Sequence, residues 1–446
     1  MFYIEYMRKV GIDMESIENE IITILEDFTG EYFSNKEGFS LDTKLFEDGL
    51  GLDSLEMLEA IYIVEDKFNI TIDPENLNEL KTIRGIIECV KSIMGNFMKS
   101  KNAYLNNRVK IMKSLIRDMN MDLDEKIVFL IGEGLDFDFQ VIRYPSLKNI
   151  KLWYGDGFNK DFEKIIFDKF KISYEEFIKE DKDTFINFIR HNLNNGNTVI
   201  CRVDDELFKN YESVSDENIQ AVRCITNVKI NKINSDNIEI DYEGVDVDNI
   251  LDGKLIISID KFLKATSSNV VPYAPQYSGY VVYKKASNQE FNIHDILKDS
   301  ILNICKKMKC QYEDKMSNGI TSLMKEIDMF WESIKSFKKD DEIINKLFNI
   351  KFKILRKTLL YGSDTLYRCE FAYGLKESLK IIDNNDLNHI SEEFIQLGRQ
   401  WLNFSRTISN FRTKDKGEFI NKLHEELNEM FIKEEELFTV LQDYYM

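Results

Sequence analysis

The sequence predicts a multidomain protein in which an all-helical domain precedes an α+β domain and a second all-helical domain. Three changes of hydrophobic pattern along the 446 residues predict this order. Apolar residues recur at helical spacing up to about residue 94, strand-type runs appear between 107 and 290, and helical spacing alone returns after 295. We therefore expect domains at residues 1–98, 107–290 and 291–446, with a polar linker at residues 99–106.

The N-terminal domain is predicted to be a four-helix bundle. Residues 14–29 are amphipathic, and a loop containing Asp42 and Thr43 follows them. A second helix begins near Ser54 and is interrupted at residues 70–74, and a last helix runs from about residue 82 to 94. A bundle of this size can fold without the rest of the chain.

The middle domain is predicted to mix helices with strands, and the C-terminal domain to be helical throughout. Helical spacing covers residues 108–119, 159–170 and 182–194. Short apolar or alternating runs predict strands over residues 127–131, 150–154, 198–203, 221–230, 237–242 and 255–259.

Composition and charge exclude several classes of function. Hydrophobic residues make up 43% of the chain, and no run of about 18 apolar residues predicts a membrane span. The formal net charge is −19, and residues 1–98 hold 21 Asp and Glu against 8 Lys and Arg. An acidic surface disfavours nucleic acid and favours protein partners with basic patches. The six cysteines show neither disulfide nor metal spacing and no secretory signal pattern is evident, so we expect a cytoplasmic protein without a metal site.

The segment Gly49-Leu50-Gly51-Leu52-Asp53-Ser54-Leu55-Glu56 carries the strongest chemical signal. Ser54 opens a helix after a glycine-containing loop, where the helix dipole and free backbone N–H groups favour a phosphodiester. Its alternative role is that of a helix-capping serine in an unmodified bundle. Acidic residues outside the apolar stripe of this helix suit docking to basic partners: Glu56, Glu59, Glu65 and Asp66.

Residues 15–95 resemble the acyl and peptidyl carrier protein family. The matching features are Asp42-Thr43 with Leu45-Phe46, the Asp53-Ser54-Leu55-Glu56 site, Glu65-Asp66-Lys67-Phe68, and Thr82-Ile83 at the last helix. The resemblance implies that Ser54 carries 4′-phosphopantetheine, with Asp53 and Leu55 completing the attachment site. It also implies three kinds of partner: a phosphopantetheinyl transferase, an enzyme that loads an acyl or aminoacyl group, and downstream biosynthetic enzymes.

The rest of the chain resembles, more distantly, butirosin biosynthesis protein H. The resemblance includes Gly132-Glu133-Gly134-Leu135-Asp136-Phe137, Val203-Asp204, Leu263-Lys264-Ala265-Thr266-Ser267-Ser268 and, in the helical part, Gly362-Ser363-Asp364-Thr365-Leu366-Tyr367-Arg368. That family implies a papain-like acyltransferase that moves an acyl group from a carrier thioester to an amine in antibiotic biosynthesis. Its members carry a nucleophilic Cys on the first helix, a His base on a strand and an orienting carboxylate.

This chain departs from that pattern at both reactive positions. The Cys position falls on Asn107 and the His position on Gln220, while Asp241 falls where the orienting carboxylate belongs. An amide has no pKa near 7, so neither residue acts as nucleophile or base, although both can donate hydrogen bonds to a thioester carbonyl or an acceptor. Cys224 lies four residues beyond Gln220, on the same side of a regular strand, and is either a displaced nucleophile or a core residue like Cys201.

Three functions remain open on these grounds. In the first, the chain is a carrier joined to an acyltransferase that orients direct attack by an amine, since proximity supplies most of the rate in such a reaction. Alternatively, the acyltransferase-like body is a pseudoenzyme that shelters the cargo or recruits a separate catalyst. The third is a helical interaction protein that carries no prosthetic group.

Overall fold

The computed structural model describes most of the chain from residue 107 onwards and part of what precedes it. The described residues are 14–29, 40–45, 60–61, 64, 80–91, 107–143, 151–207, 225–242, 250–251, 253–268, 273–283, 290–310, 320–335, 342–359, 363, 365–382, 386–409 and 416–445. The chain divides into two compact units, Met1–Tyr104 and Leu105–Met446. The mixture of helical and sheet structure expected from the sequence is confirmed.

The first unit is helical in the residues that are described. Helix α2 spans Met14–Thr29, as predicted, and buries Ile21 and Leu25. Residues 83–91 form a further helix, and residues 60, 61 and 64 are also helical. Their buried side chains are apolar and recur at helical spacing, which supplies this unit with a core: Ala60, Ile61, Val64, Ile83, Ile86, Ile87 and Val90.

The loop at residues 40–45 is joined to the start of the last helix. The backbone N–H of Leu45 donates to the oxygen of Lys81 at 3.0 Å, and the Arg84 guanidinium pairs with Asp42, with Nε 2.6 Å from Oδ1. The Thr82 hydroxyl accepts from the N–H of Gly85, three residues on, and so caps the helix. Thr82 therefore opens the last helix, as its motif predicts.

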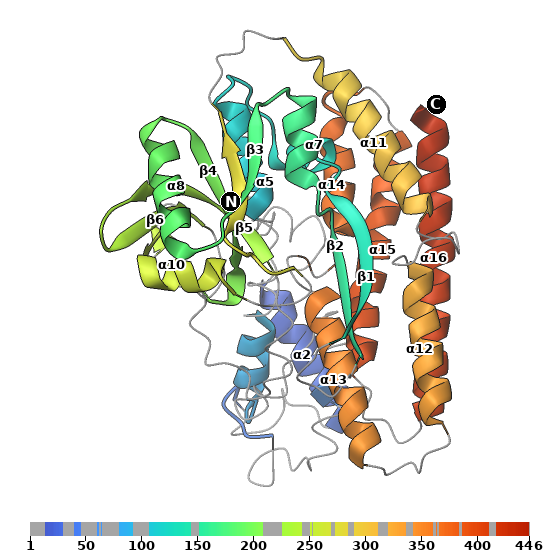
Figure 1. The fold of residues 1–446 in the computed structure, drawn as a ribbon. Coiled ribbons are helices and arrows are strands. Elements are labelled where there is room, and N and C mark those ends of the chain that lie inside the picture. Colours follow the sequence, from blue (N-terminus) through green and yellow to red (C-terminus); the bar gives the residue numbers. More distant parts are fainter. Residues whose placement is uncertain are drawn as a thin grey trace. The chain divides into compact units, whose positions relative to one another are not determined.

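The second unit contains an antiparallel sheet that, among the described residues, has seven strands in the order β3-β9-β4-β5-β6-β8-β7 (Figure 1). Side chains of β4 alternate between its two faces: Val199, Cys201 and Val203 belong to one apolar cluster and Ile200 to another. The strands are β3 Tyr174–Ile178, β4 Thr198–Asp204, β5 Ile225–Ile233, β6 Asn237–Asp241, β7 Ile250–Leu251, β8 Lys254–Ser258 and β9 Ser278–Val282.

Helices cover both faces of this sheet. Helices α8 (Lys182–Asn194) and α10 (Ile259–Thr266) bury Phe185 and Phe262 in the cluster on one face. Helix α5 (Asn107–Arg117) packs on β5 from the other face and buries Val109, Met112 and Ile116. This packing holds the N-terminus of α5 against the sheet. The 3₁₀ turn η4 (Asp205–Leu207) follows β4.

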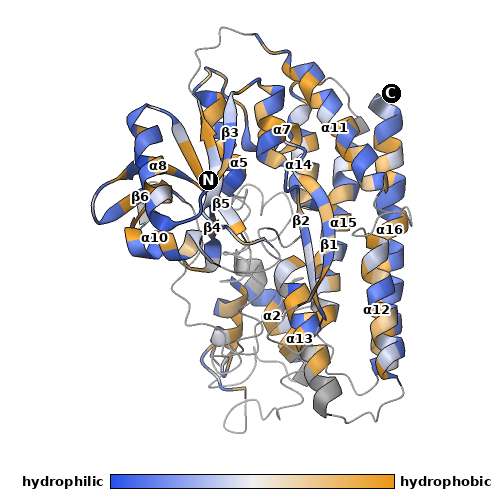
Figure 2. Cartoon of the chain, viewed as in Figure 1, coloured by the Kyte–Doolittle hydropathy of each residue, from blue (hydrophilic) through white to orange (hydrophobic). Residues whose placement is uncertain are grey.

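A two-stranded ribbon and a set of helices complete the second unit (Figure 1). Strands β1 (Leu135–Arg143) and β2 (Lys151–Phe158) pair antiparallel. The long helices carry their apolar residues in stripes (Figure 2), and those stripes join the ribbon in one continuous core that also receives α5. The helices are α6 Glu125–Ile131, α7 Phe162–Lys169, α11 Ile293–Cys310, α12 Ile320–Ile334, α13 Glu342–Leu359, α14 Arg368–Ser378, α15 Asp386–Ser409 and α16 Lys416–Tyr445.

One predicted strand is wrong, and several strands were not predicted. Residues 127–131 form most of helix α6, because Asp124 caps its N-terminus by accepting from the N–H of Lys126, and all five residues are buried. A short, wholly apolar run suits a buried helix as well as a buried strand, so its periodicity could not separate the two. Strands β1, β3, β7 and β9 were not predicted, whereas β2, β4, β5, β6 and β8 overlap the predicted ranges.

Lys351 of α13 is a buried cation against the ribbon. Its side chain lies 4.4 Å from the centre of the Trp153 ring and 5.0 Å from that of Phe330, and Nζ donates to the backbone oxygen of Lys151 at 2.5 Å. The residue is 6% exposed. Burial lowers the pKa of Lys351 to about 8, although the carboxylate of Glu326 opposes that shift.

We expect the free energy of unfolding of the wild type to rise, relative to that of Lys351→Met, between pH 8 and pH 10. In that range the unfolded chain keeps the lysine proton while the folded chain loses it, so folding becomes more favourable as pH rises. The relative gain is on the order of 3 kcal/mol, since one pKa unit corresponds to about 1.4 kcal/mol. Denaturant titrations followed by tryptophan fluorescence measure it, and parallel pH curves for the two proteins would contradict it.

Candidate functional site

The carrier attachment site predicted from the sequence lies outside the described residues. These positions are Asp53, Ser54 and Leu55 at the site and Glu56, Glu59, Glu65 and Asp66 on the helix after it. The described parts of the same unit form an apolar helical core with a capped last helix. A serine hydroxyl is the group required for a phosphodiester to pantetheine, so the residue type at position 54 fits this prosthetic group.

The first residue of α5, Asn107, contacts two neighbouring strands of the sheet. Its Nδ2 lies 2.6 Å from the backbone oxygen of Asn227 on β5 and 3.5 Å from that of Asp241 at the end of β6. Both partners are carbonyl oxygens, which only accept, so the amide nitrogen faces the sheet. The structure therefore brings Asn107 and Asp241 together, but it uses the Asn107 donor for the fold.

The carboxylate of Asp241 is held by groups other than Asn107. It accepts a hydrogen bond from Nδ2 of Asn231 and lies 3.6 Å from Nζ of Lys229. Lys229 also donates to the hydroxyl of Ser114 on α5 at 3.2 Å. These contacts join β5, β6 and α5 at one place. Gln220 and Cys224, the two remaining predicted site residues, lie outside the described residues.

Arg108, the next residue of α5, forms a buried ion pair that the sequence did not predict. Its guanidinium donates to both oxygens of Glu163 on α7, at 2.6 and 2.5 Å, and Glu163 also accepts from the side chain of Asn227 at 2.7 Å. Burial by itself raises the pKa of Glu163, but the Arg108 charge and these hydrogen bonds bring it below its ordinary value. The partners are 55 residues apart in sequence, so no local pattern signals the pair.

Asp138 and Asp156 stand opposite each other across the β1–β2 ribbon. Asp138 Oδ2 accepts from the Tyr273 hydroxyl at 2.5 Å and from Gln140 Nε2 at 2.7 Å. Asp156 accepts from the N–H of Phe158 at 2.9 Å and from the Tyr154 hydroxyl at 3.1 Å. Burial, reinforced by the negative charge of Asp138, raises the pKa of Asp156 to about 6.

This carboxyl pair is connected to the N-terminus of α5. The Arg108 guanidinium lies over the Phe158 ring, 4.7 Å from its centre, and its charge acts on Asp156. A chain of contacts thus runs from Asn107 through Asn227, Glu163 and Arg108 to the ribbon. Only Asn107 and Asp241 of this region were predicted; the motif that contains Asp136 and Phe137 precedes Asp138 but did not single it out.

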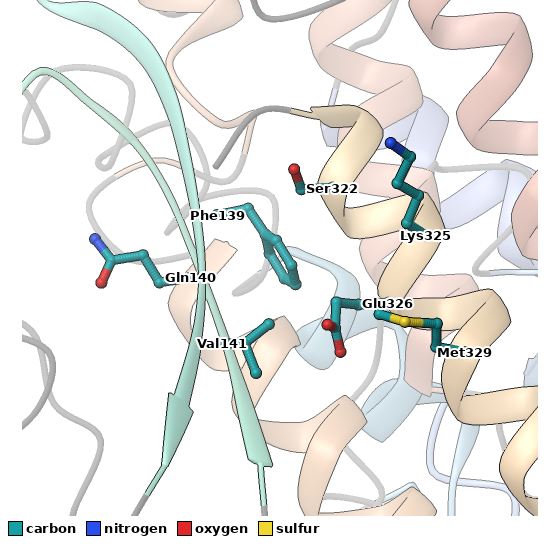
Figure 3. A pocket seen from close by; sticks show the side chains of 7 residues that line it. All are labelled: Phe139, Gln140, Val141, Ser322, Lys325, Glu326 and Met329. Atoms are coloured by element: carbon teal, nitrogen blue, oxygen red, sulfur yellow. The ribbon is translucent and has the colours of Figure 1, made fainter. Parts of the chain in front are cut away.

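A cavity of about 570 Å³ lies between β1 and α12. Figure 3 shows Phe139 and Val141 pointing from the ribbon toward Glu326 and Met329, while Gln140 points away on the other side of the strand. Glu326 lies 4.0 Å from Nζ of Lys151. The cavity is therefore largely apolar on the ribbon side and charged on the helix side.

Several further side chains have structural roles or form no site. Cys201 is fully buried in the sheet, and burial raises the pKa of its thiol, as expected for a core cysteine. Within the described ranges, no three His, Cys, Asp or Glu side chains gather closely enough to hold a metal ion. The helices described also include none with both the length and the apolar character needed to cross a membrane.

Two family models match the chain in separate places. Residues 19–90 match the phosphopantetheine attachment site, and residues 108–219 match the N-terminal region of butirosin biosynthesis protein H. Both matches agree with the resemblances seen in the sequence. The two matched ranges do not overlap, and each is similar to a different family model.

Several curated acyl carrier proteins are similar to a short part of the chain. The acyl carrier protein of Exiguobacterium sibiricum is 32% identical over 75 residues, which is 94% of that protein and 17% of this chain. That of Cyanophora paradoxa is 31% identical over 96 residues, 90% of its length and 21% of this chain, and that of Rhodococcus erythropolis is 33% identical over 89 residues, 93% of its length and 20% of this chain. The chain thus belongs to the acyl carrier protein family through a domain that carries 4′-phosphopantetheine, and it joins this domain to a butirosin biosynthesis protein H-like one.

Proposed function

We propose that this protein holds an acyl or aminoacyl thioester on the pantetheine of Ser54 and transfers the acyl group to an amine in specialised-metabolite biosynthesis. The observation that carries the proposal is the fusion itself: a carrier domain and a domain similar to one from butirosin biosynthesis protein H are present in one chain. A tether of this kind raises the local concentration of the cargo without any added contact. Whether the carrier serves its own chain or a second copy does not alter the chemistry.

The contacts of Asn107 support direct transfer without an acyl-enzyme at that position. A carboxamide is a poor nucleophile, and Nδ2 of Asn107 donates hydrogen bonds to the backbone oxygens of Asn227 and Asp241. The amine would therefore attack the thioester directly, and the body would contribute by holding both reactants in place. Its Oδ1 can only accept a hydrogen bond, so it is suited to the N–H of an amine.

The second candidate function is a scaffold that shelters the thioester or recruits a separate enzyme. The contacts of Asn107 and Asp241 favour the scaffold function, because the Asn107 amide and the Asp241 carboxylate both hold the sheet and α5 together. A body whose former reactive positions serve the fold needs no catalytic power of its own. The two candidates differ in one measurable property, which is transfer of the acyl group by the chain alone.

Transfer is tested with the full chain, after Ser54 has been converted to its pantetheine form and loaded with an acyl group. We expect amide formation with at least one amine, and a rate roughly tenfold lower in Asn107→Ala, which corresponds to about 1.4 kcal/mol of lost positioning. Asn195→Ala, at the residue that follows α8 beyond the opposite face of the sheet, is the matched control and should transfer at the wild-type rate. Mass spectrometry of the amide product measures both.

The alternatives give distinct results in this assay. If none of the amines yields an amide, the scaffold function is supported and the acyl-transfer function is contradicted. Transfer that is unaffected by Asn107→Ala and by Gln220→Ala contradicts the assignment of these positions. Loss of transfer in Cys224→Ala, with an acyl group trapped on Cys224 in the wild type, would reveal a displaced nucleophile.

A further inference from the structure

Aminolysis of a thioester requires a group that takes a proton from the attacking nitrogen. Once a neutral amine has added to the carbonyl, its nitrogen is positively charged and must lose a proton before the adduct collapses to an amide. The family's histidine position is Gln220, and an amide is not a base at neutral pH. The proton acceptor must therefore be sought among other residues around the N-terminus of α5.

Two of the carboxylates near this end of α5 are neutralised by cations. Glu163 accepts two hydrogen bonds from Arg108 and one from Asn227. Asp241 is 3.6 Å from Nζ of Lys229 and accepts from Asn231. The Arg108 charge favours the ionised form of Glu163 and lowers its pKa, so this carboxylate is a weak base, while the oxygens of Asp241 are already engaged by Asn231 and Lys229.

Asp156 differs from both in its surroundings. It is partly exposed, and within the described residues it forms no ion pair with a lysine or arginine. The cation that acts on it, Arg108, has its guanidinium on Glu163. Directly across the ribbon stands a second carboxyl group, that of Asp138, which holds the hydroxyl of Tyr273.

We propose that Asp156 is the proton acceptor for the amine in the transfer reaction, and that Asp138 adjusts its basicity from the opposite strand. This proposal depends on the transferase function proposed above. It assigns a catalytic role to a residue of the ribbon rather than to a position of the papain-like site.

The proton and electron changes balance without another reactant. The amine nitrogen donates its lone pair to the thioester carbonyl carbon, and a C–N bond forms. The Asp156 carboxylate takes one proton from that nitrogen, the C–S bond breaks, and the pantetheine sulfur leaves with the bonding pair. The carboxyl group then returns the proton to the thiolate, so that the products are an amide and a free thiol and Asp156 is ionised again.

The titration of Asp156 is suited to this role. Burial raises its pKa to about 6 and the Asp138 charge adds to the shift, while the Phe158 N–H, the Tyr154 hydroxyl and Arg108 oppose it. The Tyr273 hydroxyl also faces the pair, and burial together with its hydrogen bond to Asp138 raises its pKa, so it stays neutral. At pH 7 Asp156 is thus ionised, yet it is more basic than an ordinary aspartate.

The test is the pH profile of single-turnover transfer from the loaded full chain to an O-alkylhydroxylamine, with each rate divided by the fraction of this weakly basic nucleophile that is uncharged at that pH. The wild-type rate should rise with pH and level off above an inflection near pH 6. Asp156→Asn should lower the plateau rate about a hundredfold and remove the inflection. Asp138→Asn should move the inflection to lower pH, because the like charge that disfavours ionisation of Asp156 is gone.

A stability measurement on the unloaded chain gives an independent readout. The folded-state pKa of Asp156 is raised, so the stability of the wild type relative to Asp156→Asn should fall as the pH rises from about 4 to about 6. The inference is overturned if Asp156→Asn keeps both the rate and the inflection, or if the wild-type profile has no inflection. A wild type that transfers to no amine at any pH contradicts the proposed function itself, and the inference with it.

Discussion

Replacing Ser54 with alanine will abolish attachment of phosphopantetheine to this chain. A phosphopantetheinyl transferase links phosphopantetheine to a hydroxyl group through a phosphodiester, and alanine has no hydroxyl. Intact-mass measurement after incubation with a phosphopantetheinyl transferase and coenzyme A will show a single pantetheine adduct on the wild type and none on Ser54→Ala.

Ser40→Ala is the matched control for this experiment, because Ser40 lies in the same unit. Its hydroxyl accepts from the N–H of Asp42 at 3.3 Å, so the substitution removes a serine and one local hydrogen bond. The adduct should form on this variant as on the wild type. An adduct that persists on Ser54→Ala would place the attachment site at another residue. The lack of any adduct on the wild type would contradict the prediction that a transferase attaches phosphopantetheine to this chain.

Replacing Arg368 with methionine will destabilise the second unit by about 3–5 kcal/mol, the usual cost of leaving one member of a buried ion pair without its partner. Arg368 and Glu434 are both fully buried, and Nε of the arginine lies 2.9 Å from the carboxylate. The same guanidinium donates to the backbone oxygens of Leu366, at 2.8 Å, and Asp136, at 3.2 Å. The substitution leaves a buried carboxylate and two carbonyl groups without this donor.

Tryptophan fluorescence isolates this effect, because all three tryptophans of the chain lie between residues 105 and 446. Denaturant titrations should show that Arg368→Met/Glu434→Leu recovers a large part of the loss, since no unpaired charge is then buried. Lys376→Met removes the exposed pair with Glu392 and should cost less than about 1 kcal/mol. Equal losses in Arg368→Met and Lys376→Met would mean that burial of the pair contributes nothing.

Much of the helical structure could be predicted because the signals for it are local. The apolar spacing of α2 and the capping threonine at residue 82 each depend on residues within a few positions of one another. Residues 127–131 were wrongly predicted to form a strand, because contacts distant in sequence decide their structure. Only their burial on all sides, which is a property of the folded unit, decides that this apolar run is helix α6.

The candidate site could be predicted only in part, for a similar reason. The family pattern pointed to Asn107 and Asp241, and the fold brings them together through a backbone carbonyl rather than through the carboxylate. Glu163 and Asp156 could not be found in this way. Their roles depend on Arg108 and on the register of the β1–β2 ribbon, which pair residues that are distant in sequence or on different strands.

The sequence alone was enough to assign the carrier domain, because the predicted attachment site is a single serine in a continuous motif. The resemblance to the butirosin protein also predicts that Asn107 and Gln220 stand at the family's cysteine and histidine positions. The tertiary structure decided where the Asn107 amide is used, which carboxylates are neutralised by cations, and that Asp156 and Asp138 face each other. Charge–charge distance and burial set the basicity of a carboxyl group, and both exist only once the chain has folded.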